Sequence, residues 1–327
     1  MEREQFEGTI YRTIGLIGRG GSARIYEVED TTLGTRHAAK VQIGLFDSGL
    51  SQEDRIQRVD RMRLEAQIAA RLGHPNIPQL FKFDVLPRCG TPYLIMERLV
   101  GVDLWTALGR RKRFPVAEAI RIVRQVLSAL HAAHKHGVVH RDIKPENIFL
   151  HEASKGPPTV KVLDWGLAKV LETASSKAPE PLIFPTEEGL VVGTFAYLAP
   201  EQLKDNWADV RTDIYAVAMV LYELIAGGGP FDKYGSTSGA LERAKFERAP
   251  EPLSGRLNDP SLRELDRILR KALQRDAAQR YQSVAEFDRE LVAMLRQFKP
   301  KLIRSIVFGS ALGTIGLACA AYRLWVW

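Results

Sequence analysis

Residues 138–150 read VVHRDIKPENIFL. Two short apolar runs enclose six polar or charged side chains, and a hydrophobic core would not gather His, Arg, Asp, Lys, Glu and Asn in this way. Asp142 can accept or orient a hydroxyl proton, and Lys144 can neutralise a phosphoryl group during its transfer. The side-chain oxygen of Asn147 suits a hard cation such as Mg²⁺. The stretch therefore indicates a site for phosphoryl transfer.

A second carboxylate follows a short distance along the chain. Residues 160–163, VKVL, predict a strand that leads into Asp164, Trp165 and Gly166. Carboxylate oxygens are the ligands that Mg²⁺ prefers, so Asp164 joins Asn147 as a predicted metal ligand.

Two weaker patterns lie nearer the N-terminus. Residues 17–25, IGRGGSARI, are glycine-rich, and glycine lets backbone amides approach phosphate oxygens closely. A dinucleotide fingerprint would need a helix directly afterwards, but residues 25–28 alternate as a strand, so an ordinary hairpin turn is the alternative. Lys40 ends an apolar strand and can reach a phosphate, although a lone strand lysine is usually a surface residue. Glu65 lies within a predicted helix, and taken alone it reads as an ordinary exposed acid.

Composition limits the remaining possibilities. The 327 residues are 45% apolar and 26% charged, which is typical of a globular protein and suits one two-lobed catalytic unit. Two distant cysteines exclude a disulfide framework. The net charge of +7 comes partly from residues 110–113 and 296–304, which read as solvated surface, and no nucleic-acid motif accompanies them. No nucleic-acid partner is expected.

The hydrophobic pattern changes along the chain. Residues 11–99 predict short strands with one helix over 51–72, whereas the chain beyond residue 104 shows helical periodicity. Residues 173–190 predict a long loop, which is usually functional. The fold class is therefore α+β. Apolar positions mark three helical faces: Ile120, Val123, Leu127, Leu130; Ile214, Val217, Val220, Leu221, Leu224; and Leu262, Leu265, Ile268, Leu269, Leu273.

The C-terminal segment differs from the rest. Residues 305–322 carry no charge, and at ~1.5 Å per residue they would span ~27 Å, close to the hydrocarbon thickness of a bilayer. Basic residues precede the segment and two tryptophans follow it, so it predicts one transmembrane helix, with a buried terminal helix as the alternative. The spacing of Gly309 and Gly313 could permit helix pairing and a homodimer.

Taken together, the motifs resemble the signature set of protein kinases, in order and spacing, over about residues 11–295. The chain looks most like the bacterial, eukaryotic-like (Hanks-type) serine/threonine kinases of membranes. The resemblance implies a two-lobed protein kinase fold with a β-rich N-lobe and a helical C-lobe. It also implies transfer of the γ-phosphate of ATP, with Mg²⁺, to Ser or Thr of protein substrates.

The resemblance assigns roles to individual residues. Lys40 would hold the α and β phosphates and pair with Glu65, while Asp142 would be the catalytic base and Lys144 the phosphate-stabilising cation. Asn147 and Asp164 would bind Mg²⁺. Lining the adenine pocket would be Ile17, Ala38 and Met96. The hinge, whose backbone bonds adenine, would include Glu97 and Leu99. Asp103 would contact the ribose. The loop that covers the nucleotide would comprise Ile17, Gly18, Arg19, Gly20, Gly21, Ser22, Ala23, Arg24 and Ile25.

Further expectations concern the segment after residue 164. Glu201 would pair with Arg280, Asp213 would brace the catalytic loop, and Thr186 is the best candidate for an activating phosphosite. Glu146 and Glu223 match acids that contact basic substrates in some kinases.

Three residues depart from the family pattern: Ala23, Trp165 and Ala218. None of these departures removes a group that would touch phosphate or metal. A membrane-anchored pseudokinase scaffold and a small-molecule kinase of the same fold remain alternatives. The spacing of His131, His134 and His136 could suggest a zinc site, but it fits the helix before the catalytic loop better.

The predicted organisation has six parts: an N-terminal extension (1–10), the N-lobe with hinge (11–99), the C-lobe (100–296), a basic juxtamembrane stretch (297–304), the transmembrane helix (305–322) and a short tail (323–327). A polar N-terminus argues against secretion. The expected location is a single-pass, tail-anchored membrane protein whose catalytic domain faces the cytoplasm and whose C-terminal helix contacts lipid.

Overall fold

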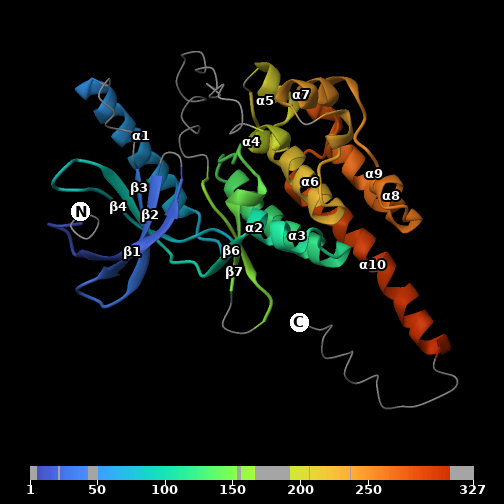
Figure 1. The fold of residues 1–327 in the computed structure, drawn as a ribbon, viewed down its shortest axis with the longest axis horizontal. Helices are drawn as coiled ribbons and strands as arrows, with labels where there is room; N and C mark the ends of the chain where they lie inside the picture. The colour runs from blue at the N-terminus through green and yellow to red at the C-terminus, as the bar shows by residue number, and fades with distance from the viewer. Residues whose placement is uncertain are drawn as a thin grey trace.

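A computed structural model describes residues 6–20, 23–42, 51–152, 156–165, 192–205, 207–235 and 237–309. A β-sheet with one long helix forms the first lobe, and a bundle of helices forms the second (Figure 1). The predicted two-lobed α+β fold is confirmed.

The N-lobe is built on a five-stranded antiparallel sheet with strand order β1-β2-β3-β5-β4. Its buried side chains, such as Tyr26, Val41 and Ile95, form a core separate from that of the second lobe. The strands are β1 (Tyr11–Arg19), β2 (Ala23–Asp30), β3 (Arg36–Gln42), β4 (Leu80–Val85) and β5 (Pro92–Met96).

Phe6 adds to this core from outside the predicted lobe. Its ring packs edge-on against Tyr93, with 5.3 Å between ring centroids, and against Tyr26. The surrounding N-terminal residues are polar, so periodicity gave no sign that this single aromatic side chain is buried.

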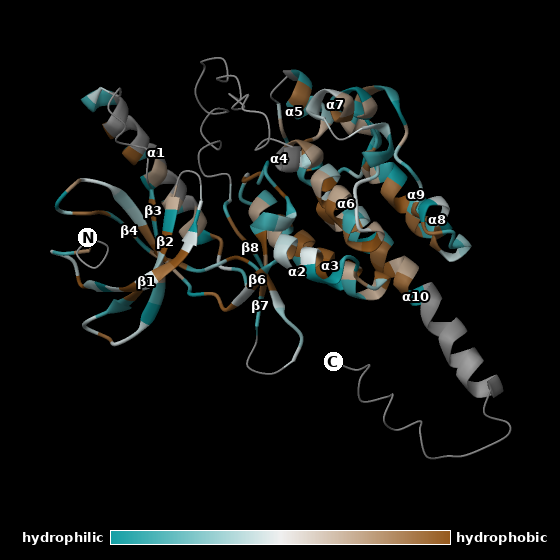
Figure 2. Ribbon diagram, viewed as in Figure 1, coloured by the Kyte–Doolittle hydropathy of each residue, from teal (hydrophilic) through white to brown (hydrophobic). Residues whose placement is uncertain are grey.

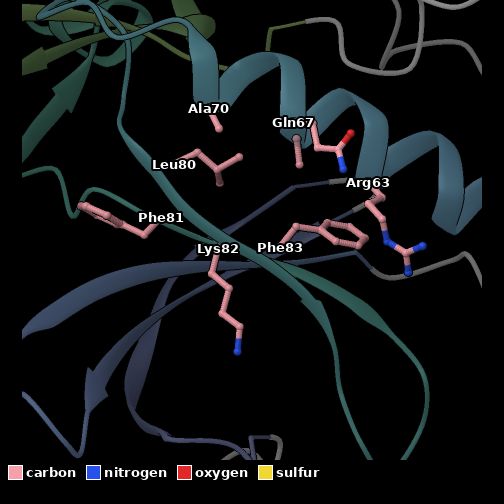
Figure 3. A pocket seen from close by; sticks show the side chains of 8 residues that line it. Arg63, Gln67, Ala70, Leu80, Phe81, Lys82 and Phe83 are labelled. Atoms are coloured by element: carbon pink, nitrogen blue, oxygen red, sulfur yellow. The ribbon is translucent and has the colours of Figure 1, made fainter.

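The helix predicted over residues 51–72 is α1 (Gln52–Arg71). It lies across β4, and a groove of about 300 Å³ runs between them (Figure 3). Leu80 and Phe83 point toward the helix, whereas Lys82 points away from it. The guanidinium of Arg63 lies 5.7 Å from the centre of the Phe83 ring.

A small second sheet stands at the junction of the lobes. It pairs β6 (Gly101–Asp103), β7 (Ile148–His151) and β8 (Thr159–Val162), all antiparallel. The predicted catalytic loop, which ends at Asn147, leads into β7, and Asp164 follows the end of β8. This sheet therefore fixes the positions of both the catalytic loop and Asp164.

The C-lobe is helical, and α6 runs through its centre. Nearly every α6 side chain is buried, and the three apolar faces predicted from the sequence lie in one core. Figure 2 marks the hydrophobic residues along these helices in brown. Leu262 and Leu273 flank the third of these helices rather than belonging to it. The helices are α2 (Leu104–Arg111), α3 (Val116–His134), α4 (Val192–Tyr197), α5 (Pro200–Asp205), α6 (Val210–Ala226), α7 (Ser238–Glu247), α8 (Leu253–Arg256), α9 (Arg263–Ala272) and α10 (Val284–Gly309).

The last helix, α10, packs its first part on α3, α6 and α9 and then extends past the lobe (Figure 1). It continues through the predicted juxtamembrane stretch. No helix within the described ranges is both long enough and apolar enough to cross a bilayer. Residues 310–327, which include most of the predicted transmembrane segment, lie outside the described residues, as do the predicted loop 173–190 and Thr186.

Candidate active site

Strand register brings the N-lobe site residues into one row. Gly18 lies opposite Ile25, Ile25 opposite Lys40, and Lys40 opposite Leu94. A Cβ atom on Gly18 would lie 3.3 Å from Ile25, so a side chain at residue 18 would crowd the row.

The glycine-rich turn is closed by a backbone hydrogen bond. The Gly20 amide donates to the Ala23 carbonyl over 2.8 Å, and Arg19 pairs with Arg24 across the hairpin. Gly21 and Ser22 lie outside the described residues. The expected wall residues Ala38 and Met96 lie directly opposite each other on β3 and β5, and Ile17 is half exposed.

Lys40 reaches from the N-lobe to the end of β8. Its ammonium group forms an ion pair with the carboxylate of Asp164, 124 residues further along the chain. The predicted partner, Glu65, lies on α1, but its side chain is outside the described residues, so that pairing stays a prediction. The contact brings the predicted phosphate ligand and the predicted metal ligand together.

Asp213 holds the catalytic loop from beneath, as the sequence predicted. Its carboxylate is fully buried and accepts hydrogen bonds from the amides of His140 (2.9 Å) and Arg141 (2.8 Å) and contacts the ring of His134 (2.7 Å). Burial acts to raise the pKa of Asp213, but the hydrogen bond with His134 and the charges of both histidines outweigh it and leave that pKa below its usual value. Because it is ionised and fully bonded, Asp213 fixes the loop backbone.

The carboxylate of Asp142 is held by a hydrogen bond and by an ion pair. The side-chain amide of Asn147 donates to the Oδ2 atom of Asp142 over 3.0 Å and to its carbonyl over 2.8 Å. The ammonium of Lys144 lies 3.0 Å from the same Oδ2 atom. The three residues that the sequence assigned to phosphoryl transfer are therefore in direct contact.

The chain after β8 is pinned against this loop. The amide of Leu163 donates to the carbonyl of Asn147 over 2.8 Å, and the His140 ring contacts the carbonyl of Leu163 at 2.8 Å. Asp164 follows immediately with φ 50° and Arg141 has φ 67°, left-handed backbone conformations that are uncommon for residues other than glycine. Trp165 is buried against His140 and donates from its indole nitrogen to Val162.

These residues fit a magnesium ion. The amide nitrogen of Asn147 points at Asp142, which leaves its oxygen as a possible ligand, and the Asp164 carboxylate is half exposed. Mg²⁺ is usually held by one or two protein oxygens together with substrate phosphates. Among the described residues, no three His, Cys, Asp or Glu side chains form a metal-binding group.

The hinge residues carry charge pairs that the sequence did not reveal. Glu97 accepts from the buried Lys161 over 2.6 Å, and Arg98 pairs with Glu27 on β2 at 2.9 Å. Asp103 caps α2, since its two carboxylate oxygens accept from the amide and the hydroxyl of Thr106. Contacts of Glu97, Leu99 and Asp103 with a nucleotide stay predictions.

The segment after residue 192 connects to the catalytic loop. The side-chain amide of Gln202 donates to the Arg141 carbonyl over 2.9 Å. The predicted pair of Glu201 with Arg280 is confirmed, with both guanidinium nitrogens 2.7 Å from the carboxylate. This buried pair anchors α5 to the body of the C-lobe.

An acidic group lies beside this segment. Tyr197 donates a hydrogen bond to Glu223 of α6. Burial, which the Tyr197 hydrogen bond partly offsets, raises the pKa of Glu223 to about 7, and the charges of Asp232 and Glu146 act in the same direction. The acids singled out in the sequence, Glu146 and Glu223, are therefore within electrostatic reach of each other.

Sequence reasoning missed Lys161, Gln202 and the buried Lys245 of α7. A lysine between two valines of a strand reads as a surface residue, and a polar residue on a short helix carries no periodic signal. Only the tertiary packing shows that these side chains are buried.

Comparison with known proteins agrees with this geometry. The family model for the protein kinase domain matches residues 11–290. The chain is 36% identical over 284 residues to the serine/threonine-protein kinase pkn3 of Myxococcus xanthus, covering 87% of this chain and 50% of that protein. It is 33% identical over 293 residues to the serine/threonine-protein kinase PknA of Mycobacterium tuberculosis, covering 89% and 62% respectively. The chain thus spans about half the length of the curated relatives it matches.

A solved structure shows the same architecture. The PknI kinase domain of Mycobacterium tuberculosis superposes with a TM-score of 0.64 at 25% identity, covering 90% of this chain and 99% of that one. The motifs, the lobes and these matches agree, and the chain belongs to the protein kinase domain family, in its bacterial Hanks-type branch.

Proposed function

We propose that the protein is an active serine/threonine protein kinase that transfers the γ-phosphate of ATP to proteins. One observation supports this most strongly. The Lys40–Asp164 ion pair joins the lobes, and the residue before Asp164 is hydrogen-bonded to Asn147, which together with Lys144 holds the carboxylate of Asp142. A scaffold that only bound partners would have no need to keep all five groups.

The residues divide the chemistry between them. Asp142 accepts the proton of the acceptor hydroxyl as that oxygen attacks the terminal phosphorus. Lys144, 3.0 Å from Asp142, balances the charge of the transferring group, and Lys40 holds the phosphates that stay behind. Asn147 and Asp164 would hold Mg²⁺, which neutralises phosphate charge when bound. The residues 17–25 cover the nucleotide.

Phosphosite mapping tests this proposal. The full chain is incubated with Mg²⁺ and ATP, and its phosphorylated residues are identified by mass spectrometry, for wild type and Asp142→Asn. We expect phosphate on Ser and Thr of the wild type, with Thr186 among the sites, and none on the variant. Wild type that binds ATP but gains no phosphate would favour the pseudokinase scaffold.

We further propose that residues 305–322 cross a membrane, with the catalytic lobes on the cytoplasmic side, and that Gly309 and Gly313 permit pairing of two copies. Support comes from the uncharged run and the basic residues before it. Fractionation of cells tests the anchor, because recovery wholly in the soluble fraction would contradict it.

A further inference from the structure

Lys161 is a buried cation that the proposed chemistry does not use. It belongs to β8, which stands where the two lobes meet (Figure 2), and it is 7% exposed. Its ammonium group donates to the Oε2 atom of Glu97 over 2.6 Å, and Glu97 is the first hinge residue after β5. Taking a cation out of water costs free energy, which a short bond to a carboxylate offsets. The hinge is therefore tied directly to β8.

The backbone on both sides of Lys161 is fixed. The carbonyl of Val160 accepts from the side-chain amide of Asn76 over 2.7 Å, and the amide of Val162 donates to the backbone carbonyl of Asn76 over 2.8 Å. The amide of Val160 donates to the side-chain oxygen of Gln125 on α3 over 3.0 Å. Because both of its neighbours are bonded in this way, Lys161 holds its ammonium group at one place relative to the C-lobe.

Glu97 is held by three hydrogen bonds. Its backbone amide donates to the carbonyl of Gln79 over 2.8 Å, and its Oε2 atom accepts from the amide of Gln79 over 3.2 Å as well as from Lys161. Within the described residues, no hydrogen bond involves the backbone carbonyl of Glu97 or the backbone amide of Leu99. One acceptor and one donor of the hinge are thus left for a base.

The stretch that carries Lys161 also reaches the other end of the nucleotide site. Asp164, the proposed Mg²⁺ ligand, follows Lys161 by three residues. Between them, the amide of Leu163 donates to the carbonyl of Asn147 over 2.8 Å, so this part of the chain is fixed as well. Lys161 therefore sets the position of the hinge relative to the groups that bind phosphate and metal.

A carbonyl at a fixed place can distinguish the two purine bases. Adenine carries an amino group at C6, which donates to a carbonyl, whereas guanine carries a carbonyl oxygen at the same position. Against the carbonyl of Glu97, guanine would bring two acceptors together without a donor, and unpaired polar groups in a site cost affinity. A hinge that could shift would avoid part of this cost and would discriminate less.

We propose that Lys161 is a positioning residue for base selection: by holding the side chain of Glu97, it keeps the Glu97 carbonyl where adenine bonds to it and guanine does not. The proposal rests on the proposed kinase function. It predicts a loss of the preference for adenine nucleotides and not a uniform loss of affinity, since the phosphates are bound by groups outside the hinge.

Equilibrium binding of ADP and GDP to the full chain with Mg²⁺ tests the proposal, because the kinase consumes neither nucleotide and calorimetry gives both dissociation constants. Lys161→Met removes the ammonium group and keeps an unbranched side chain. We expect its Kd for ADP to rise about tenfold and its Kd for GDP to change by less than about twofold. In phosphate transfer, the KM for ATP should rise likewise while kcat stays within about twofold of wild type.

Two further variants show whether Lys161 acts through Glu97. Glu97→Gln keeps an acceptor for the amide of Gln79 and weakens the bond with Lys161. In that background, Lys161→Met should raise the Kd for ADP by less than about threefold. Lys271→Met is a matched control, because it breaks a lysine–glutamate pair of 2.9 Å with Glu286 in the C-lobe, and both of its dissociation constants should equal those of wild type.

The ratio of the GDP and ADP dissociation constants decides the outcome. If Lys161→Met does not fold, as judged by circular dichroism, Glu97→Gln tests the same pair from the partner whose side chain is 27% exposed, and it should lower the ratio. A wild type without preference for ADP, a folded variant with the wild-type ratio, or an equal loss for both nucleotides overturns the proposal. Wild type that binds ADP but transfers no phosphate from ATP contradicts the kinase function instead, and the binding ratio still decides the role of Lys161.

Discussion

Individual residues of the site are held by contacts that the family pattern does not dictate. Trp165 stands where the family usually has phenylalanine, and it is 4% exposed. Its indole nitrogen donates to the Val162 carbonyl over 2.9 Å, a bond that a phenylalanine ring cannot make, while its ring packs 4.9 Å from His140. The larger side chain therefore secures the chain next to Asp164.

Replacing this tryptophan should weaken the fold. Trp165→Phe loses one buried hydrogen bond and part of the packing, so we expect the free energy of unfolding to fall by about 1–2 kcal/mol in urea titration. Trp105→Phe, at a position 51% exposed, should change it by less than about 0.5 kcal/mol. Equal effects of the two substitutions would show that the Val162 bond contributes nothing.

Glu223 gives the fold a pH dependence of known sign. Its pKa is raised to about 7, from 4.5, so the folded state holds a proton that the unfolded state releases. Its contribution is most favourable below pH 4.5 and is lost as the pH rises through about 7. In Glu223→Gln, the fall in the free energy of unfolding with rising pH should be smaller by on the order of 2 kcal/mol. Urea unfolding at pH 5 and pH 8 measures it, with the exposed Glu247→Gln as control; parallel curves for both variants would refute the assignment.

At the scale of elements, the sheet between the lobes depends on one glycine. Gly101 begins β6 with φ 137°, a conformation that other residues rarely adopt. A Cβ atom there would lie 2.1 Å from the carbonyl oxygen of Leu150 on β7. Because β7 pairs with β6 and directly follows the catalytic loop, any shift of β6 would disturb both β7 and that loop.

We therefore expect Gly101→Ala to destabilise the protein by about 2 kcal/mol or more, as measured by thermal or urea unfolding. Gly109→Ala is a matched control, because nothing lies within 4 Å of its Cβ position and alanine favours the helix α2. It should leave stability unchanged or raise it by up to ~1 kcal/mol. A harmless Gly101→Ala would mean that β6 can move freely.

Elements were the scale at which the sequence was most informative. The apolar faces of α3, α6 and α9 and the ends of α1 follow from periodicity and capping, because those signals are local. The contacts of Asp213 and of Glu201 with Arg280 were also foreseen, since the motifs fix their places. The Lys40–Asp164 pair and the burial of Lys161 and Lys245 were not, because they depend on how distant elements approach each other.

For the whole molecule, the connection between α1 and β4 couples the lobes. Leu72 and Ile77 belong to the core of the C-lobe although they follow an N-lobe helix. Asn76 is buried, and its side-chain amide donates to the backbone carbonyl of Val160 over 2.7 Å. The backbone carbonyl of Asn76 accepts from the backbone amide of Val162 over 2.8 Å. The ion pair of Lys161 with Glu97 makes a second link at the hinge.

Asn76→Ala should loosen this coupling. The loss of the buried amide leaves the Val160 carbonyl without that donor, so we expect a cost of about 1–3 kcal/mol and a broader unfolding transition, as the lobes unfold less cooperatively. Fluorescence and circular dichroism, followed in parallel during urea unfolding, would reveal separate midpoints. If the fluorescence and circular dichroism curves of Asn76→Ala coincide and have the wild-type midpoint, Asn76 does not couple the two lobes.

The central claim is that Asp142, held by Asn147 and Lys144, catalyses phosphate transfer to proteins. The most direct test is the rate of transfer from labelled ATP to myelin basic protein by wild type and by Asp142→Asn, with ATP affinity measured alongside. We predict a loss of about 10²–10⁴-fold in rate, with ATP affinity within about twofold of wild type. A folded Asp142→Asn protein that transfers phosphate at the wild-type rate would contradict the account.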